Sequence, residues 1–113
     1  AMSPDEKWVA AGTENNRAML IALDHDETRF IDNVREGKTK AVAYSPRGDR
    51  FVLADERGNI ALIDTNKATV VGRAKLLFDV AERLLILPDG ETLIVDTARG
   101  MRVRFRIRTP GAN

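Results

Sequence analysis

The hydrophobic and polar positions of the chain follow a repeating order of short apolar runs and polar turns. The clearest example is Ala41 to Asp64, which reads AVAYSPRGDRFVLADERGNIALID. Three apolar runs are separated there by a Ser-Pro-x-Gly turn and a Glu-Arg-Gly-Asn turn. Proline fixes φ in a turn and glycine accepts positive φ, while short runs rich in β-branched and aromatic residues favour strands. This order predicts antiparallel β-strands joined by tight turns.

The same unit recurs at a fixed spacing. Pro4, Pro46 and Pro88 lie in similar turns, and successive prolines are 42 residues apart. Each of these turns is followed by an apolar run, a second polar turn and another apolar or alternating run. A period of about 40 to 45 residues is the length of one four-stranded blade of a β-propeller.

The pattern predicts ten strands in three units, with three strands in the first unit, four in the second and three in the third. The first unit lacks an inner strand and the third lacks an outer one. The expected strands span residues 7–13, 18–24 and 28–34, then 39–44, 50–54, 59–64 and 68–72, and finally 83–87, 92–96 and 101–108.

These units resemble the WD40 repeat and related β-propeller repeats. In that family an inner strand leads into Ser-Pro-Asp-Gly, then a strand, a polar turn and a strand that ends in Trp-Asp. Here Leu23-Asp24 and Ile63-Asp64 stand at the Trp-Asp position, and Phe105-Arg106 departs from it further. The resemblance covers nearly the whole chain, as about two and a half divergent blades. It implies an all-β fold of antiparallel four-stranded meander repeats, a partial propeller, and a non-catalytic scaffold that binds proteins.

The expected organisation is a single domain or propeller fragment over residues 1–113, with repeats at about 3–38, 39–80 and 81–113. An alanine precedes Met2, which indicates either a residue left by expression or a segment excised from a longer protein, and the second is the expectation. A closed propeller needs at least about four blades, so unpaired strand edges are expected. The chain should therefore form a homo-oligomer or pack against the remainder of a larger propeller.

Residues 70–86 also fit a different prediction. Apolar positions recur there with a helical period, and Asp79 with Arg83 would form an i,i+4 ion pair. The repeat register instead requires an outer strand, a connection and an inner strand in this segment. The main expectation is an all-β fold, and the alternative is an α+β fold with a helix at about 70–86.

Composition narrows the function classes without selecting a partner. The net charge of +1 gives no general attraction to nucleic acid or membranes, and no apolar run approaches the roughly 18 residues that span a bilayer. The chain has no cysteine, which excludes disulfides and thiolate metal sites and fits a reducing, cytoplasmic location. Protein partners are therefore favoured over nucleic acid or membrane.

A basic strand is the clearest candidate surface. Arginines alternate with apolar residues from Met101 to Arg108, so a period of two places their side chains on one face. An anionic partner is one interpretation, and a solvated face whose like charges discourage aggregation is the other. No aromatic residue interleaves on the basic face, so base stacking is not supported. The candidate partner-binding residues are Arg99, Arg102, Arg104, Arg106, Arg108 and, separately, Trp8.

No catalytic, cofactor-binding or metal site is predicted. The run Asp24-His25-Asp26-Glu27 is consecutive, and the chain has no second histidine, whereas zinc sites use spaced ligands and usually several His or Cys. His25 is also the sole imidazole available to a catalytic triad, and no nucleophile motif accompanies it. The sequence therefore predicts a non-enzymatic protein-binding scaffold. The alternatives are a self-associating module that completes its blades across subunits and an accessory propeller segment of a larger enzyme.

Overall fold

The computed structural model describes residues 1–13, 17–32, 34 and 37–106 of the chain. These residues form ten β-strands and no helix. The strands are β1 (Trp8–Gly12), β2 (Ala18–Ala22), β3 (Thr28–Ile31), β4 (Thr39–Tyr44), β5 (Arg50–Asp55), β6 (Asn59–Asp64), β7 (Thr69–Lys75), β8 (Ala81–Ile86), β9 (Thr92–Thr97) and β10 (Arg102–Arg106).

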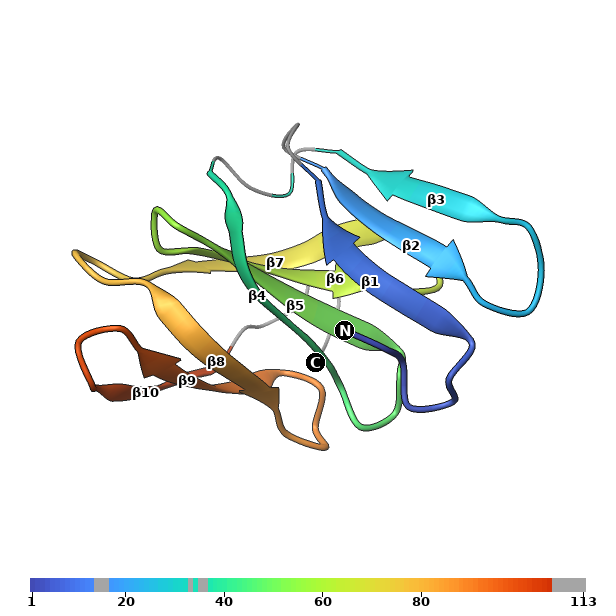
Figure 1. The fold of residues 1–113 in the computed structure, drawn as a ribbon. Coiled ribbons are helices and arrows are strands. Elements are labelled where there is room, and N and C mark those ends of the chain that lie inside the picture. The colour runs from blue at the N-terminus through green and yellow to red at the C-terminus, as the bar shows by residue number, and fades with distance from the viewer. Residues whose placement is uncertain (14–16, 33, 35–36, 107–113) are drawn as a thin grey trace.

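The strands form three antiparallel sheets, each a meander in which neighbours along the chain pair with one another. The first sheet contains β1–β3, the middle sheet β4–β7 and the third sheet β8–β10. Figure 1 shows the middle sheet between the other two, with β4 beside both β1 and β8. The predicted all-β fold with three, four and three strands is therefore confirmed.

The proline-containing turn of each repeat, which precedes β1, β5 and β9, recurs in its hydrogen bonds as well as in its sequence. In the middle sheet, the Ser45 N–H donates to the Arg50 carbonyl oxygen and the Gly48 N–H donates to the Ser45 carbonyl oxygen. The same two bonds occur 42 residues earlier, from Ser3 to Trp8 and from Glu6 to Ser3, and 42 residues later, from Leu87 to Thr92 and from Gly90 to Leu87. The period of the sequence is thus a period of the backbone.

The fourth residue of this turn has a left-handed conformation in all three copies. Its φ is +76° at Gly48 and +73° at Gly90, where glycine has no Cβ to clash. The first copy places Glu6 there with φ +61°. The fold therefore imposes this conformation even where the residue disfavours it.

The middle sheet is buried on both faces. Along β5, Phe51 and Leu53 face the first sheet, whereas Val52 and Ala54 face the third sheet. This two-sided burial explains why β5 and β6 read as continuous apolar runs rather than alternating ones. One core lies between the first and middle sheets, and its buried residues are Ala10, Ala18, Leu20, Ile31, Val34, Phe51, Leu53, Ala61 and Ile63. The other lies between the middle and third sheets, with Val52, Ala54, Ile60, Leu62, Leu76, Ala81, Ile86, Leu93 and Val95.

The alternative helix at about 70–86 is wrong. This segment is β7, a short connection and β8. Two large apolar residues of the helical pattern, Leu77 and Phe78, lie in the connection with 76% and 86% of their surfaces exposed. These two exposed residues contributed to the helical spacing of apolar positions. The spacing therefore did not correspond to one buried face of a helix.

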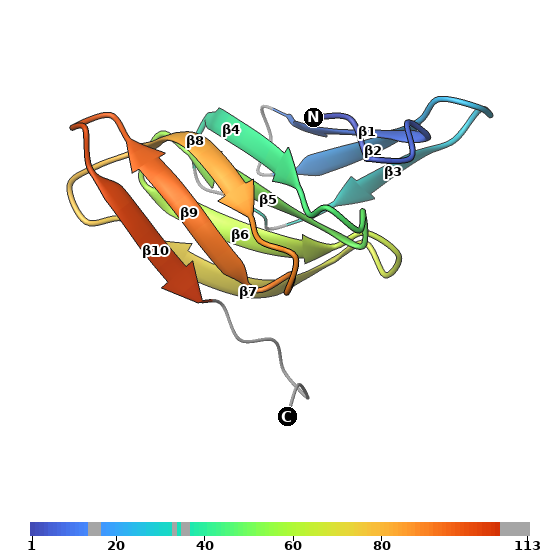
Figure 2. The same ribbon diagram turned by 90° about the horizontal axis from the view of Figure 1, so that it is seen from below.

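The edges of the first and third sheets differ from those of the middle sheet. Ala1 and Ala10 exchange backbone hydrogen bonds of 2.8 Å, and Met2 bridges Val9. Ala1 and Met2 thus lie along β1 in the way that the end of β4 lies along β5. On the third sheet, β10 is an edge strand at the end of the assembly (Figure 2). Among the described residues, no strand pairs with its outer edge, where the middle sheet has β7.

Candidate interaction surface

The arginines of β10 share one face of the third sheet. Arg102, Arg104 and Arg106 are exposed, whereas Val103 and Phe105 between them are half-buried and pack against the core toward the middle sheet. The period-two alternation expected from the sequence is therefore present in the described part of β10. The fourth arginine of the predicted series, Arg108, lies outside the described residues.

The strand register adds further side chains to this face. Residues that pair directly across antiparallel strands have side chains on the same side of the sheet. Arg102 pairs with Asp96, and Arg104 pairs with Ile94. Ile94 pairs in turn with Leu85, and Asp96 with Arg83. We call this surface the arginine face, and it consists of Arg83, Leu85, Ile94, Asp96, Arg102, Arg104 and Arg106.

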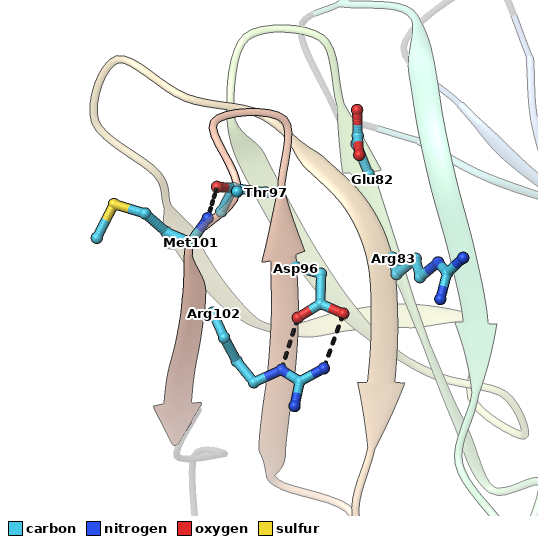
Figure 3. A pocket seen from close by; sticks show the side chains of 7 residues that line it. Glu82, Arg83, Asp96, Thr97, Met101 and Arg102 are labelled. Carbon is cyan, nitrogen blue, oxygen red and sulfur yellow. Dashed lines mark hydrogen bonds and ion pairs between the residues drawn. The ribbon is translucent and has the colours of Figure 1, made fainter.

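One carboxylate on the arginine face is held by one guanidinium. The Arg102 Nε donates to Asp96 Oδ1 at 2.7 Å and a terminal nitrogen of Arg102 donates to Asp96 Oδ2 at 3.1 Å (Figure 3). These bonds hold the pKa of Asp96 below its usual range and raise that of Arg102. The pair lies beside a shallow pocket lined by Glu82, Arg83, Asp96, Thr97, Gly100, Met101 and Arg102. Because Arg102 is exposed, the pair orders this surface more than it stabilises the fold.

The remaining arginines of the face are less compensated. Arg106 lies 3.8 Å from a Glu91 carboxylate oxygen. Arg104 has no carboxylate within ion-pair distance in the part of the chain that the structure describes. The arginine face therefore carries a local excess of positive charge that the net charge of +1 for the chain does not reveal.

The other two candidate residues lie elsewhere. Arg99 is exposed in the turn between β9 and β10, and its backbone N–H donates to Asp79 Oδ1 at 3.3 Å. Trp8 is in the first sheet, half-buried against the core toward the middle sheet. Its ring lies 5.3 Å from the Arg29 guanidinium and makes an edge contact with His25. The structure thus separates Trp8 from the arginine face.

The acidic turn around His25 forms a local hydrogen-bond cluster. The His25 Nδ1 lies 2.5 Å from Asp24 Oδ1, and Nε2 lies 2.7 Å from Glu27 Oε1. The contact with Glu27 first, and that with Asp24 second, raise the pKa of His25. Both ring nitrogens are therefore already engaged. Among the described residues there is no group of three or more His, Cys, Asp or Glu side chains placed to hold a metal ion.

The first sheet presents a second surface, which the sequence analysis missed. The cross-strand pairs Val9–Ile21, Ala11–Met19 and Met19–Phe30 place five apolar side chains on the face opposite the core. We call it the first-sheet face. Its first four residues are partly exposed, and Phe30 is 54% exposed with the Arg17 guanidinium 5.6 Å above its ring.

The repeat spacing shows what this surface matches. Val9, Ala11, Met19 and Ile21 lie 84 residues before Leu93, Val95, Val103 and Phe105, which pack the third sheet onto the middle sheet. They also lie 42 residues before Phe51, Leu53, Ala61 and Ile63, with which the middle sheet packs onto the first. The signal was present in the sequence as apolar residues at equivalent repeat positions. The first-sheet face therefore has the composition of a sheet-packing surface.

The arginine face of the third sheet does not have apolar residues at the repeat positions that pack one sheet onto the next. The middle sheet packs onto the third through Ala54, Ile60 and Leu62, among other residues. The equivalent positions of the third sheet hold Asp96, Arg102 and Arg104. The two ends of the stack of three sheets are therefore chemically different: the first-sheet face is apolar and the arginine face is basic.

Comparison with known proteins bears on the fold. No model of a known protein family matches the sequence, and the search of curated proteins finds no match. Solved structures do match over nearly the whole chain. Hydrazine synthase of Kuenenia stuttgartiensis matches with a TM-score of 0.71 and 17% sequence identity, over 97% of this chain and 34% of that one.

A second similar structure is the β-propeller domain of Cps50 (Swd1) from Myceliophteria thermophila. It matches with a TM-score of 0.71 and 17% identity, over 95% of this chain and 37% of that one. The fold is a partial β-propeller. The propeller fold expected from the WD40 resemblance is therefore confirmed, and each sheet is a complete or incomplete blade. At this identity the likeness concerns the fold alone.

The chain spans about a third of the length of each of these two structures. Within the described residues, no helix is long and apolar enough to cross a membrane.

Proposed function

We propose that this chain is a non-catalytic protein-binding module, a scaffold built from propeller blades. The proposal includes the division into repeats at about 3–38, 39–80 and 81–113. The observation that carries it is the first-sheet face, an apolar surface left partly open at one end of the assembly. Exposed contiguous apolar surfaces on soluble domains are typical of protein interaction sites.

The partner chemistry follows from the two internal interfaces. In both of them, small and aliphatic side chains of one sheet pack against a face of the next sheet that adds a phenylalanine, Phe51 or Phe105, to its aliphatic residues. Val9, Ala11, Met19 and Ile21 repeat this composition at the same positions of the blade. The partner of the first-sheet face is accordingly another β-sheet with small and aliphatic residues on its contacting face.

A scaffold role is favoured over catalysis by the placement of the polar groups. His25 is the single histidine of the chain, and both of its ring nitrogens are engaged by carboxylates. The polar groups of the pocket on the third sheet are arranged around an arginine–aspartate pair rather than a nucleophile and a base. The non-enzymatic function and the cytoplasmic location are part of this proposal.

A second candidate function is a homo-oligomer in which copies of this chain cover one another. The same first-sheet face favours it, because an apolar surface can pack against its own copy around a two-fold axis. A ring of head-to-tail copies is disfavoured, since it would join the apolar first-sheet face to the charged arginine face. An accessory segment of a larger enzyme is a third candidate, in line with the similarity to part of hydrazine synthase.

An added blade tests whether the first-sheet face receives a sheet. A copy of residues 39–84 placed ahead of Ala1 supplies β4 to β7 and the first four residues of β8. These four residues continue into Ala1 and Met2, which already lie along β1. We expect the longer chain to unfold at a higher urea concentration and with a larger m-value, because the added sheet buries the first-sheet face.

The matched control carries Leu62→Glu only in the added copy, since Leu62 makes the sheet contact in the original copy. This control should lose the gain in stability. The proposed function fails if the added copy exchanges its amide hydrogens as an unfolded tail, or if the control is as stable as the test chain.

A further inference from the structure

We propose that the outer edge of β10 binds an extended segment of a partner protein, in which apolar and acidic residues alternate, as the fourth strand of the third sheet. This inference rests on the proposed protein-binding function and names a second contact, at the end opposite the first-sheet face. The middle sheet shows the geometry, because β7 lies along the outer edge of β6 and β6 is the repeat equivalent of β10.

The backbone of β10 offers hydrogen bonds at its outer edge. The Thr97 N–H donates to the Met101 carbonyl oxygen at 2.9 Å, which makes this pair a hydrogen-bonded one. Antiparallel pairs alternate, so the backbone groups of Val103 and Phe105 point toward β9. Those of Arg102, Arg104 and Arg106 therefore point away from the sheet. A strand edge with unpaired N–H and C=O groups is a template for another strand.

The arginine side of the edge selects acidic residues. A residue directly opposite Arg104 on an added strand would lie on the arginine face. Arg102 is already paired with Asp96, and Arg106 lies near Glu91, whereas Arg104 has no carboxylate within reach among the described residues. An incoming carboxylate at this position would form a charge-assisted hydrogen bond with Arg104.

The other side of the edge selects apolar residues. Val103 and Phe105 are half-buried at the margin of the core between the middle and third sheets. On the middle sheet, Ile63 is the repeat equivalent of Phe105, and the added strand β7 places Val70 opposite it, against the core between the first and middle sheets. Incoming residues opposite Val103 and Phe105 would cover them in the same way. The two sides together define alternation of acidic and apolar residues.

This chain does not contain such a segment. No stretch of the sequence has acidic residues at alternate positions with an apolar residue between them: Asp24 and Asp26 flank a histidine, and Asp89 and Glu91 flank a glycine. A second copy of these 113 residues therefore does not supply the strand, and the proposal commits to a segment of a different protein. Nucleic acid is disfavoured for two reasons. The arginine face has no aromatic side chain for base stacking, and phosphate oxygens offer no hydrogen-bond donor to the C=O groups of a strand edge.

Synthetic peptides test the proposal with the full chain. The probe is a fluorescein-labelled nine-residue peptide of alternating valine and glutamate, and the controls are alternating valine and lysine, and a block peptide with the composition of the probe. We expect the probe to raise fluorescence anisotropy saturably and to bind at least about tenfold more tightly than either control. Arg104→Glu should weaken binding about tenfold or more. Arg47→Glu, at an exposed turn position with the same change in charge, should leave it unchanged.

A backbone variant separates strand addition from simple charge attraction. Arg104→Pro and Arg104→Ala remove the same guanidinium, but only the proline also removes an N–H that points outward, and it leaves the β9 hydrogen bonds in place, as proline is tolerated on edge strands. Arg104→Pro should abolish the binding that Arg104→Ala retains, without lowering the melting temperature by more than a few degrees. If this variant fails to fold, a probe N-methylated at every second residue replaces it, and the methylated probe should not bind.

Three results would overturn the proposal. They are equal binding of the alternating and block peptides, unchanged binding to Arg104→Glu, and displacement of the probe by a single-stranded oligonucleotide at equal concentration. Any of them, together with a gain in stability from the added blade, would sink the strand site and leave the proposed function standing. If the peptide binds as expected but the added blade gives no gain in stability, only the proposed role of the first-sheet face is contradicted.

Discussion

Arg104 occupies in the third sheet the position that Leu62 occupies in the middle sheet. Both residues are on the third strand of their sheets, 42 residues apart, and both face away from the first sheet. Leu62 is fully buried between the middle and third sheets, whereas Arg104 is exposed. One position of the repeat thus serves packing in one copy and charge in the next.

Truncation at these two equivalent positions should have different effects on stability. Leu62→Ala removes buried methyl groups from the core and should lower the free energy of unfolding by about 2–5 kcal/mol. Arg104→Ala should change it by less than about 0.5 kcal/mol, because it is a surface substitution. Urea unfolding followed by circular dichroism measures both values. Equal losses would mean that Arg104 is buried and that the third sheet is covered in solution.

Gly12 and Thr39 are in close contact across the junction of the first and middle sheets. A Cβ on Gly12 would overlap the Thr39 side chain, whose Oγ1 is buried without a hydrogen-bond partner among the described residues. Gly12→Ala should therefore lower the free energy of unfolding by about 1–3 kcal/mol. Adding Thr39→Ala should restore part of it, because that change removes Oγ1 and Cγ2 but keeps the Thr39 Cβ, which would lie 2.6 Å from the new Cβ. An additive double variant in urea unfolding would contradict this contact.

Glu6 should be replaceable by glycine with a gain in stability. Its left-handed backbone costs a non-glycine residue about 1–2 kcal/mol, and glycine gives back about 0.5–1 kcal/mol through the entropy of the unfolded chain. The net expectation for Glu6→Gly is a gain of about 0.5–1 kcal/mol in thermal or urea unfolding. Gly90→Ala, at the equivalent position of the third turn, should lose about 1 kcal/mol. A loss for Glu6→Gly would show that its side chain matters more than its backbone.

The pKa of His25 should lie above 6.5, the ordinary value for histidine, in the folded chain. Its contacts with Glu27 and Asp24 stabilise the protonated ring, so Glu27→Gln should lower this pKa. Titration of the His25 ring protons by NMR measures the change directly. A pKa at or below 6.5 in the wild type would contradict the two contacts.

The same shift has a consequence for stability against pH. Because the folded pKa is raised, the contribution of His25 is fully present below the unfolded value of about 6.5 and is lost as the pH rises through the folded pKa. The stability difference between wild type and Glu27→Gln should therefore shrink over that window. If the stability difference between wild type and Glu27→Gln instead grew with pH, a raised pKa of His25 would be contradicted.

The sequence was sufficient to predict the strands because turn residues mark the ends of the apolar runs in each repeat. The prolines at positions 4, 46 and 88 mark turns with the same hydrogen bonds, and the runs between them became the strands of three meanders. The period-two pattern of Arg102 to Arg106 likewise predicted one arginine side and one packed side of β10. Local residue chemistry fixes both features.

What the sequence did not reveal depends on which sheet faces are covered. A helical period over 70–86 was misleading because Leu77 and Phe78 belong to an exposed connection, and composition does not show exposure. The pairing of Asp96 with Arg102 requires the register across the turn at residues 97–101. The first-sheet face escaped notice because its apolar residues look like any core strand until a neighbouring sheet is known to be lacking among the described residues.

The mass of the chain in solution tests the central claim, that the first-sheet face binds protein, most directly. Sedimentation velocity over a range of concentrations should show reversible self-association of the wild type, because the partly open apolar face packs against a copy of itself when its own partner is absent. Ile21→Glu should be monomeric with an unchanged circular dichroism spectrum, and Arg104→Glu at the opposite end should associate like the wild type. A wild-type chain that is strictly monomeric and cooperatively folded at the highest concentrations would contradict the account.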